Sequence, residues 1–117
     1  MNLLDTDAVL NLLRQGRYEE GAISVLTLIE VLRGVGEEKR GEVKLLLEES
    51  FDVLNLSNKV IITYCKIYEK LREKGETLPD ADLLIAATSI SKGLSIKTGD
   101  KHFERLRQFG LSVAPIQ

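Results

Sequence analysis

The chain has 117 residues, of which 44% are hydrophobic and 29% are charged, a balance typical of a globular domain and not of a disordered segment. Lys and Arg number 16 and Asp and Glu number 18, so the net charge of −2 excludes binding to nucleic acid through a large excess of positive charge. One cysteine excludes an intrachain disulfide and a cysteine-rich zinc site. No signal peptide or membrane-length apolar stretch is visible, so we expect a single domain, residues 1–117, in the cytoplasm.

In the first half of the chain, short apolar runs predict strands, and apolar residues spaced three and four apart predict helices. Asp or Thr after the first run is suited to cap a helix, and glycines separate the segments. The expected strands are residues 2–4 and 22–26, and the expected helices are residues 8–14, 27–35 and 37–50.

The second half continues the alternation of strand and helix. Cys65 falls on an apolar stripe of the first of its helices, which predicts that this side chain is buried in the core. The expected strands are residues 51–56, 94–97 and 111–114, and the expected helices start at Ser57 or Asn58, at residue 81 and at residue 101.

Strands that alternate with helices predict crossover connections and therefore a mostly parallel sheet. Five short strands with helices on both faces give an α/β fold, a three-layer α/β/α sandwich. Ligands of such folds bind at the carboxyl ends of the strands, where the strand order reverses.

Four acidic residues from separate segments are expected at this edge of the sheet. Asp5 follows the first strand and Asp100 follows the fourth, while Glu30 and Asp82 each lie in the first turn of a helix. Asp82 reaches this edge only if the chain first passes back under the sheet. Each acid alone is explained by helix capping, and residues 27–30 fit a capping box. Together, however, four carboxylates at one edge would repel one another, by about 4 kcal/mol for a pair ~4 Å apart.

A cation among the four carboxylates would relieve this repulsion. Carboxylate oxygens are hard ligands, and neither His102 nor Cys65 has a soft partner nearby in the sequence. Mg²⁺ or Mn²⁺ is therefore the expected ion, and Mg²⁺ on carboxylates commonly serves phosphodiester hydrolysis.

Four sequence blocks resemble those of PIN domains, the ribonuclease domains of VapC-type toxins. The blocks are residues 4–7 (LDTD), 24–34 (SVLTLIEVLRG), 82–88 (DLLIAAT) and 97–103 (KTGDKHF), and they occur in the family's order. The resemblance implies a metal-dependent endoribonuclease that cuts single-stranded or loop RNA. It also implies a toxin that is neutralised by a cognate antitoxin and that forms a homodimer.

The resemblance assigns roles to individual residues. Three acids would bind metal directly or through water, and the fourth, Glu30, would bind metal or orient the attacking water. Thr6 and Thr98 match hydroxyls that support the site, and Asp7 stands beside them. The acids that match the catalytic and metal-binding quartet are Asp5, Glu30, Asp82 and Asp100.

Basic residues near these blocks are candidates for contacts to RNA phosphates, although a solvated surface explains them equally well. These candidates are Arg14, Arg17, Lys97, Lys101, His102 and Arg105. The apolar helices before and after Phe51 are candidates for a dimer face or an antitoxin groove, and core packing explains them as well.

Other functions compete with the nuclease. A phosphatase of the haloacid dehalogenase type would use Asp5 as nucleophile and Asp7 as acid and base, but the later Asp of its Gly-Asp-x-x-x-Asp segment is replaced by Glu104. A phospho-receiver domain would need an Asp after the third strand, which residues 56–58 (LSN) do not supply. A non-catalytic module that binds metal or RNA remains an alternative.

Overall fold

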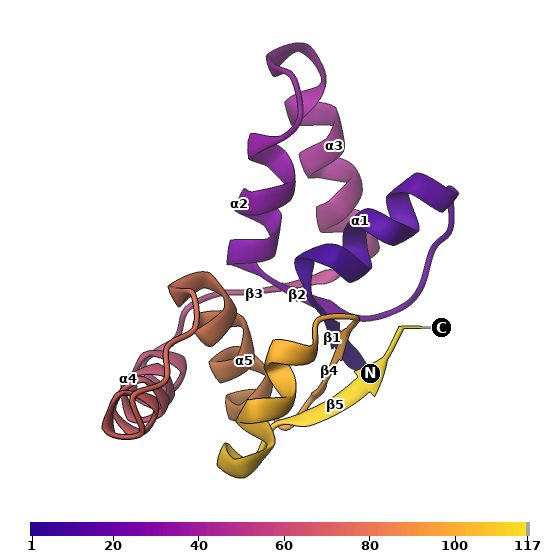
Figure 1. The fold of residues 1–117 in the computed structure, drawn as a ribbon. Coiled ribbons are helices and arrows are strands. Elements are labelled where there is room, and N and C mark those ends of the chain that lie inside the picture. The colour runs from indigo at the N-terminus through magenta and orange to yellow at the C-terminus, as the bar shows by residue number, and fades with distance from the viewer. Residues whose placement is uncertain (117) are drawn as a thin grey trace.

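The computed structural model describes residues 1–116, which form one five-stranded parallel sheet between two layers of helices (Figure 1). The strands are β1 (Asn2–Leu4), β2 (Ala22–Ser24), β3 (Asp52–Leu54), β4 (Ser95–Thr98) and β5 (Ser112–Pro115). The helices are α1 (Thr6–Gln15), α2 (Val25–Arg33), α3 (Glu37–Ser50), α4 (Asn58–Glu73), α5 (Asp80–Lys92) and the 3₁₀ helix η1 (Lys101–Phe109).

The strand order is β3-β2-β1-β4-β5, and every neighbouring pair is parallel. The chain builds outward from β1 in one direction through β2 and β3, and then returns to place β4 on the other side of β1. The order therefore reverses between β1 and β4, which is where ligands bind in open parallel sheets. The predicted α/β/α sandwich is confirmed.

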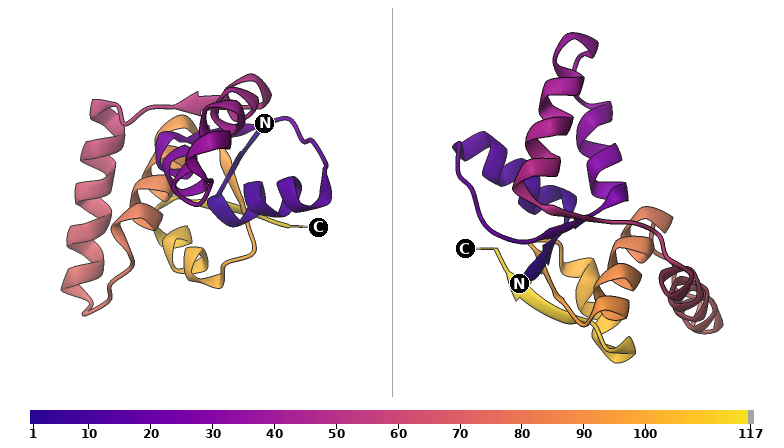
Figure 2. Two further views of the ribbon diagram at one scale, coloured as in Figure 1. Left: turned by 90° about the horizontal axis from the view of Figure 1, so that it is seen from above. Right: turned by 180° about the vertical axis from the view of Figure 1, so that it is seen from behind.

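Two hydrophobic cores lie on the two faces of the sheet, because successive residues of a strand point to opposite sides. Leu3 packs with residues of α4, α5 and η1, and its neighbour Leu4 packs with residues of α1, α2 and α3. Figure 2 shows the same division, with α1, α2 and α3 on one side of the sheet. Within residues 1–116, no helix combines the length and apolar character needed to cross a membrane.

Helix α2 begins two residues earlier than predicted, at Val25. Ser24 ends β2 and its hydroxyl accepts a hydrogen bond from Leu26 N at 3.1 Å, which caps the helix. The predicted strand to residue 26 and the predicted capping box at residues 27–30 are therefore wrong. Ser24 and Thr27 are both residue types that commonly cap helices, so the choice of Thr27 from the sequence had no local signal against it.

The predicted core position of Cys65 is also wrong, because this side chain is exposed. Helix α4 carries apolar residues on two faces, and the inner face is Val60, Ile67 and Leu71. Cys65 lies on the outer face, near the exposed Ile61 and Tyr68.

Candidate metal and nucleic-acid site

Asp5 is the most buried acid of the predicted quartet, with 4% of its surface exposed. It follows β1 and caps α1, because its Oδ1 accepts a hydrogen bond from Ala8 N at 2.9 Å. Its Oδ2 accepts a hydrogen bond from the hydroxyl of Thr98. Asp5 N also donates to Lys97 O at 3.2 Å, so the carboxylate sits where β1 and β4 end side by side.

Burial raises the pKa of Asp5 from 3.8 to about 6, and the neighbouring charges of Asp7 and Asp100 act in the same direction. The hydrogen bonds from Thr98 and Ala8 oppose the rise. The ionised form of Asp5 is thus destabilised by its surroundings, and a cation placed beside it would be favoured.

Asp82 lies in the first turn of α5 and is half-buried. Burial raises its pKa first, followed by the charges of Asp100 and Glu30. No hydrogen bond among the described residues contributes to that pKa. The N-cap of α5 is Pro79, and it makes no side-chain cap bond, so the explanation of Asp82 as a helix cap is wrong.

The position of Asp82 depends on the path of α4. Figure 1 shows α4 beside α5, and residues 74–79 join these two helices. Helix α5 then leads to the start of β4. The charges of Asp100 and Asp7 act on the pKa of Asp82, so the first turn of α5 lies within electrostatic range of the starts of η1 and α1.

Glu30 lies in the second turn of α2, not in the first turn as predicted, because the helix starts at Val25. Its Oε1 accepts a hydrogen bond from the Thr6 hydroxyl at 2.6 Å, and its Oε2 lies 3.7 Å from Arg33 Nη2. The Thr6 hydroxyl also lies 3.2 Å from the hydroxyl of the buried Thr27. Thr6 thus fixes Glu30 toward the start of α1.

Asp100 caps η1, as predicted, because its Oδ1 accepts a hydrogen bond from His102 N at 2.9 Å. His102 Nδ1 lies 3.2 Å from the same oxygen, and the ring is exposed. Asp100 N donates to the Thr98 hydroxyl at 2.9 Å, and Thr98 in turn donates to Asp5. One hydroxyl therefore links two of the four acids.

The predicted acids lie within electrostatic range of one another: the charge of Asp100 raises the pKa of Asp5 and of Asp82, and that of Glu30 raises the pKa of Asp82. Among residues 1–116, however, no three His, Cys, Asp or Glu side chains lie close enough to form a coordination shell. Asp7 is exposed and contributes charge to this group. The donor set consists of hard carboxylate oxygens and fits a hard divalent cation in type and charge.

The predicted phosphate contacts do not form one cluster. Lys101 and His102 are exposed beside Asp100, whereas Arg105 lines a separate hollow with Gly75 and Gln108. Arg14 is exposed in the last turn of α1, and Arg17 lies in the loop after it. Lys97 is paired with Glu19, as its Nζ lies 2.6 and 2.8 Å from the two carboxylate oxygens. Sequence reasoning did not identify Glu19.

Comparison with known proteins agrees with this arrangement. The PIN domain family model matches residues 3–108. Ribonuclease VapC1 of Methanocaldococcus jannaschii is 38% identical over 115 residues, which cover 95% of this chain and 85% of that protein. Ribonuclease VapC of Rickettsia bellii is 30% identical over 108 residues, covering 86% of this chain and 81% of that protein.

Solved structures share the fold. VapBC-1 from nontypeable Haemophilus influenzae superposes with a TM-score of 0.80 at 22% identity, covering 97% of this chain and 96% of that one. VapBC2 from Rickettsia felis, bound to a DNA fragment from its promoter, gives a TM-score of 0.76 at 22% identity, covering 99% and 98%.

Proposed function

The chain belongs to the PIN domain family, and we propose that it is a VapC-type endoribonuclease that hydrolyses phosphodiester bonds of single-stranded or loop RNA. The observation that supports this proposal is that acids from separate segments lie within electrostatic range of one another at the strand-order reversal. Burial raises the pKa of Asp5 there to about 6, and the charges of Asp7 and Asp100 add to the rise. We also propose that residues 1–117 form one PIN domain that works in the cytoplasm.

PIN-domain ribonucleases depend on metal in general, and we propose Mg²⁺ or Mn²⁺ for this chain. Asp5, Asp82 and Asp100 would hold the ion, directly or through water, with Glu30 as a further ligand or as the group that orients the attacking water. A bound divalent cation would supply a strong positive charge that promotes ionisation of water and stabilises the leaving oxygen.

The surrounding hydroxyls orient the acids. Thr98 donates to Asp5 and accepts from Asp100 N, so it fixes the relative position of the segments that follow β1 and β4. Thr6 holds Glu30 toward the same edge. The charge of Asp7 raises the pKa of Asp5. Within residues 1–116, no side-chain hydrogen bond holds the Asp7 carboxylate in place. Hydroxyls in such positions act as supports for ligands and not as nucleophiles.

The phosphatase alternative is not favoured. That family needs an Asp where this chain has Glu104, so its motif is incomplete. The match of residues 3–108 to the PIN domain model supports the nuclease instead.

The solved VapBC structures are complexes of toxin with antitoxin, and we propose that this chain likewise binds an antitoxin. A hollow of about 310 Å³ lies between α1 and α3, with Leu13 and Leu46 at its exposed rim. An apolar hollow between two helices is suited to receive an amphipathic helix. A neighbouring reading frame for a small DNA-binding protein would favour this role over general RNA processing.

A homodimer is also proposed, and the outer face of α4 supports it. This face exposes Ile61, Ile62 and Tyr68, of which Ile62 is 56% exposed. Apolar side chains grouped on one exposed helix face commonly mark a protein interface.

Cleavage of a fluorescent RNA in the presence of Mn²⁺ tests the nuclease proposal. The wild-type chain should cut it and Asp5→Asn should not. Asp52→Asn is the matched control, because Asp52 is exposed at the start of β3, on the opposite edge of the sheet. Equal cleavage by the wild type and Asp5→Asn would overturn the proposal.

A further inference from the structure

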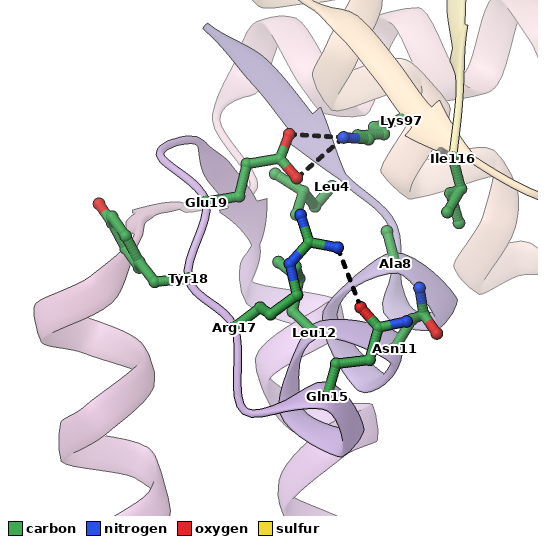
Figure 3. Close-up of a pocket in the computed structure, with 10 residues that line it drawn as sticks. All are labelled: Leu4, Ala8, Asn11, Leu12, Gln15, Arg17, Tyr18, Glu19, Lys97 and Ile116. Carbon is green, nitrogen blue, oxygen red and sulfur yellow. Dashed lines mark hydrogen bonds and ion pairs between the residues drawn. The ribbon is translucent and has the colours of Figure 1, made fainter.

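A cavity of about 270 Å³ lies beside the acidic site, under the loop that joins α1 to β2 (Figure 3). Two of its lining residues connect it to the acids. Ala8 lines the cavity and donates its N–H to Asp5. Lys97 also lines it, from the face of β4 opposite to that of Thr98. Ile116 lines both this cavity and a neighbouring hollow that contains Thr98, Asp100 and Lys101. The cavity therefore begins at the first turn of α1, which Asp5 caps, and borders the hollow that contains Asp100.

The chemistry of the walls is divided between apolar and polar groups. Polar groups make up most of the exposed lining, among them the amides of Asn11 and Gln15 of α1. The buried Leu4, Ala8 and Leu12, with Ile116, add a smaller apolar surface. Among the side chains drawn in Figure 3, Asn11 has no hydrogen-bond partner. Such a division matches a nucleobase, which has apolar faces and a polar edge that carries both donors and acceptors.

Positive charge in the cavity comes from Arg17. Lys97 is neutralised by Glu19, and that ion pair fastens the loop against β4. Arg17 Nη1 donates to Gln15 Oε1 at 3.3 Å, and no ion pair joins Arg17 to any other residue of the part that the structure describes. A guanidinium in this position offers a planar surface on which a base stacks, or a donor for a phosphate.

Tyr18 is not part of this arrangement, although it borders the cavity. Its ring lies 6.3 Å from the ring of Phe51, centroid to centroid, and Figure 3 shows it directed away from Arg17 and Lys97.

The size of the cavity limits how large a ligand it can hold. It lies just below the ~300 Å³ at which ordinary ligand pockets begin, which is room for one base and not for a dinucleotide.

We propose that this cavity binds one unpaired RNA base next to the scissile phosphate, with the Asn11 and Gln15 amides reading its edge, and so determines cleavage specificity. This inference rests on the proposed ribonuclease function and deepens it. Arg17 contributes affinity that does not depend on the base, and the Glu19–Lys97 pair keeps the loop in place.

The test is cleavage of a randomised single-stranded RNA pool by the purified full chain with Mn²⁺, followed by sequencing of the cut ends. The wild type should prefer a base at one fixed position relative to the cut. Asn11→Ala should reduce that preference roughly 10-fold, about the contribution of one bidentate contact between an amide and a base. Preferences at other positions should not change.

Further variants separate reading of the base from a structural effect. Asn11→Asp keeps the shape of the side chain but loses its N–H donors, so it should change which base is preferred. Arg17→Ala should raise KM for all sequences alike. Asn58→Ala, on the exposed start of α4, is the control and should leave the pattern as in the wild type.

Binding gives a second readout that does not require cleavage. The affinity of Asp5→Asn for short RNA homopolymers of each base should differ between bases, and adding Asn11→Ala should reduce that difference. If Asn11→Ala and Asn11→Asp leave both the cut pattern and the binding preference unchanged, the inference is overturned and a protein partner is the better occupant. If base-dependent binding is lost in Asn11→Ala but the wild type cuts no RNA, the cavity proposal stands and the nuclease proposal fails.

Discussion

The hydroxyl of Thr98 donates a hydrogen bond to Asp5 and so joins the ends of the two central strands, β4 and β1. Both side chains are buried, and the same hydroxyl accepts a hydrogen bond from Asp100 N. The contact links residues 93 positions apart in the sequence. The hydrogen bond therefore fixes the Asp5 carboxylate at the point where the strand order reverses.

Replacing Thr98 by Val is expected to lower RNA cleavage roughly 10- to 100-fold, the range typical of groups that orient metal ligands. The variant keeps the shape of the side chain but leaves Asp5 and Asp100 N without their shared partner. Unfolding in urea should show that the free energy of unfolding is about 1–3 kcal/mol lower than in the wild type. Thr98→Ser keeps the hydroxyl and should stay near the wild type in cleavage. Equal losses in Thr98→Ser and Thr98→Val would argue against this role.

The stability of the metal-free protein is expected to fall as the pH rises from about 4 to about 6. The folded Asp5 carboxyl keeps its proton up to a pKa of about 6, whereas the unfolded carboxyl loses it near 3.8. The folded state therefore binds more protons in this window, and the free energy of unfolding decreases with pH. The shift corresponds to about 3 kcal/mol at most.

Urea unfolding in EDTA across this pH range checks the expectation. Asp5→Asn should show a shallower decrease, with a remainder from Asp82, whose pKa is also raised. Asp52→Asn should keep the wild-type slope. Parallel curves for the wild type and Asp5→Asn would show that Asp5 does not titrate in this window.

Addition of Mn²⁺ is expected to stabilise the wild-type chain at neutral pH. An ion that binds only the folded state raises the free energy of unfolding by about 2.7 kcal/mol when its free concentration is 100 times its Kd. The gain should be much smaller in Asp5→Asn and Asp100→Asn, because each removes a carboxylate charge from the group. Melting temperatures with and without Mn²⁺ measure it. A gain of the same size in both variants would place the bound ion elsewhere on the surface.

Much of this fold follows from local patterns, and the errors have identifiable causes. The sequence predicts that an Asp or Thr after the first strand caps α1 and that Asp100 caps η1, because a polar residue directly after a strand and before a helix is a local signal. Asp5 and Asp100 are these caps. The start of α2 was predicted wrongly, because Ser24 and Thr27 are equally common types of N-cap residue. The place of Asp82 could be expected only conditionally, because it depends on how α4 lies against the sheet.

The spacing of apolar residues also did not predict which face of α4 is buried, because this helix has two apolar faces. The pattern that includes Cys65 is as regular as the pattern of Val60, Ile67 and Leu71, and only packing decides which of them is buried. The Glu19–Lys97 pair could not be predicted from the sequence, because its residues are 78 positions apart and no spacing rule links them.

The wild-type chain is expected to be a dimer in solution, and Ile62→Asp is expected to be monomeric. The substitution places a charge in the exposed apolar face of α4, where a second copy would have to desolvate it. Light scattering during size-exclusion chromatography measures the mass. Lys70→Ala, which is exposed on another side of α4, is the control and should remain dimeric. An unchanged mass for Ile62→Asp would exclude this face as the interface.

The rate of Mn²⁺-dependent RNA cleavage by Asp82→Asn tests the central claim most directly. Asp82 neither caps its helix nor owes its pKa to any hydrogen bond within residues 1–116, so its substitution should leave the melting temperature near that of the wild type. If carboxylates from separate segments hold one catalytic ion, the rate should fall on the order of 100-fold or more. A stably folded Asp82→Asn that cuts RNA as fast as the wild type would contradict the account.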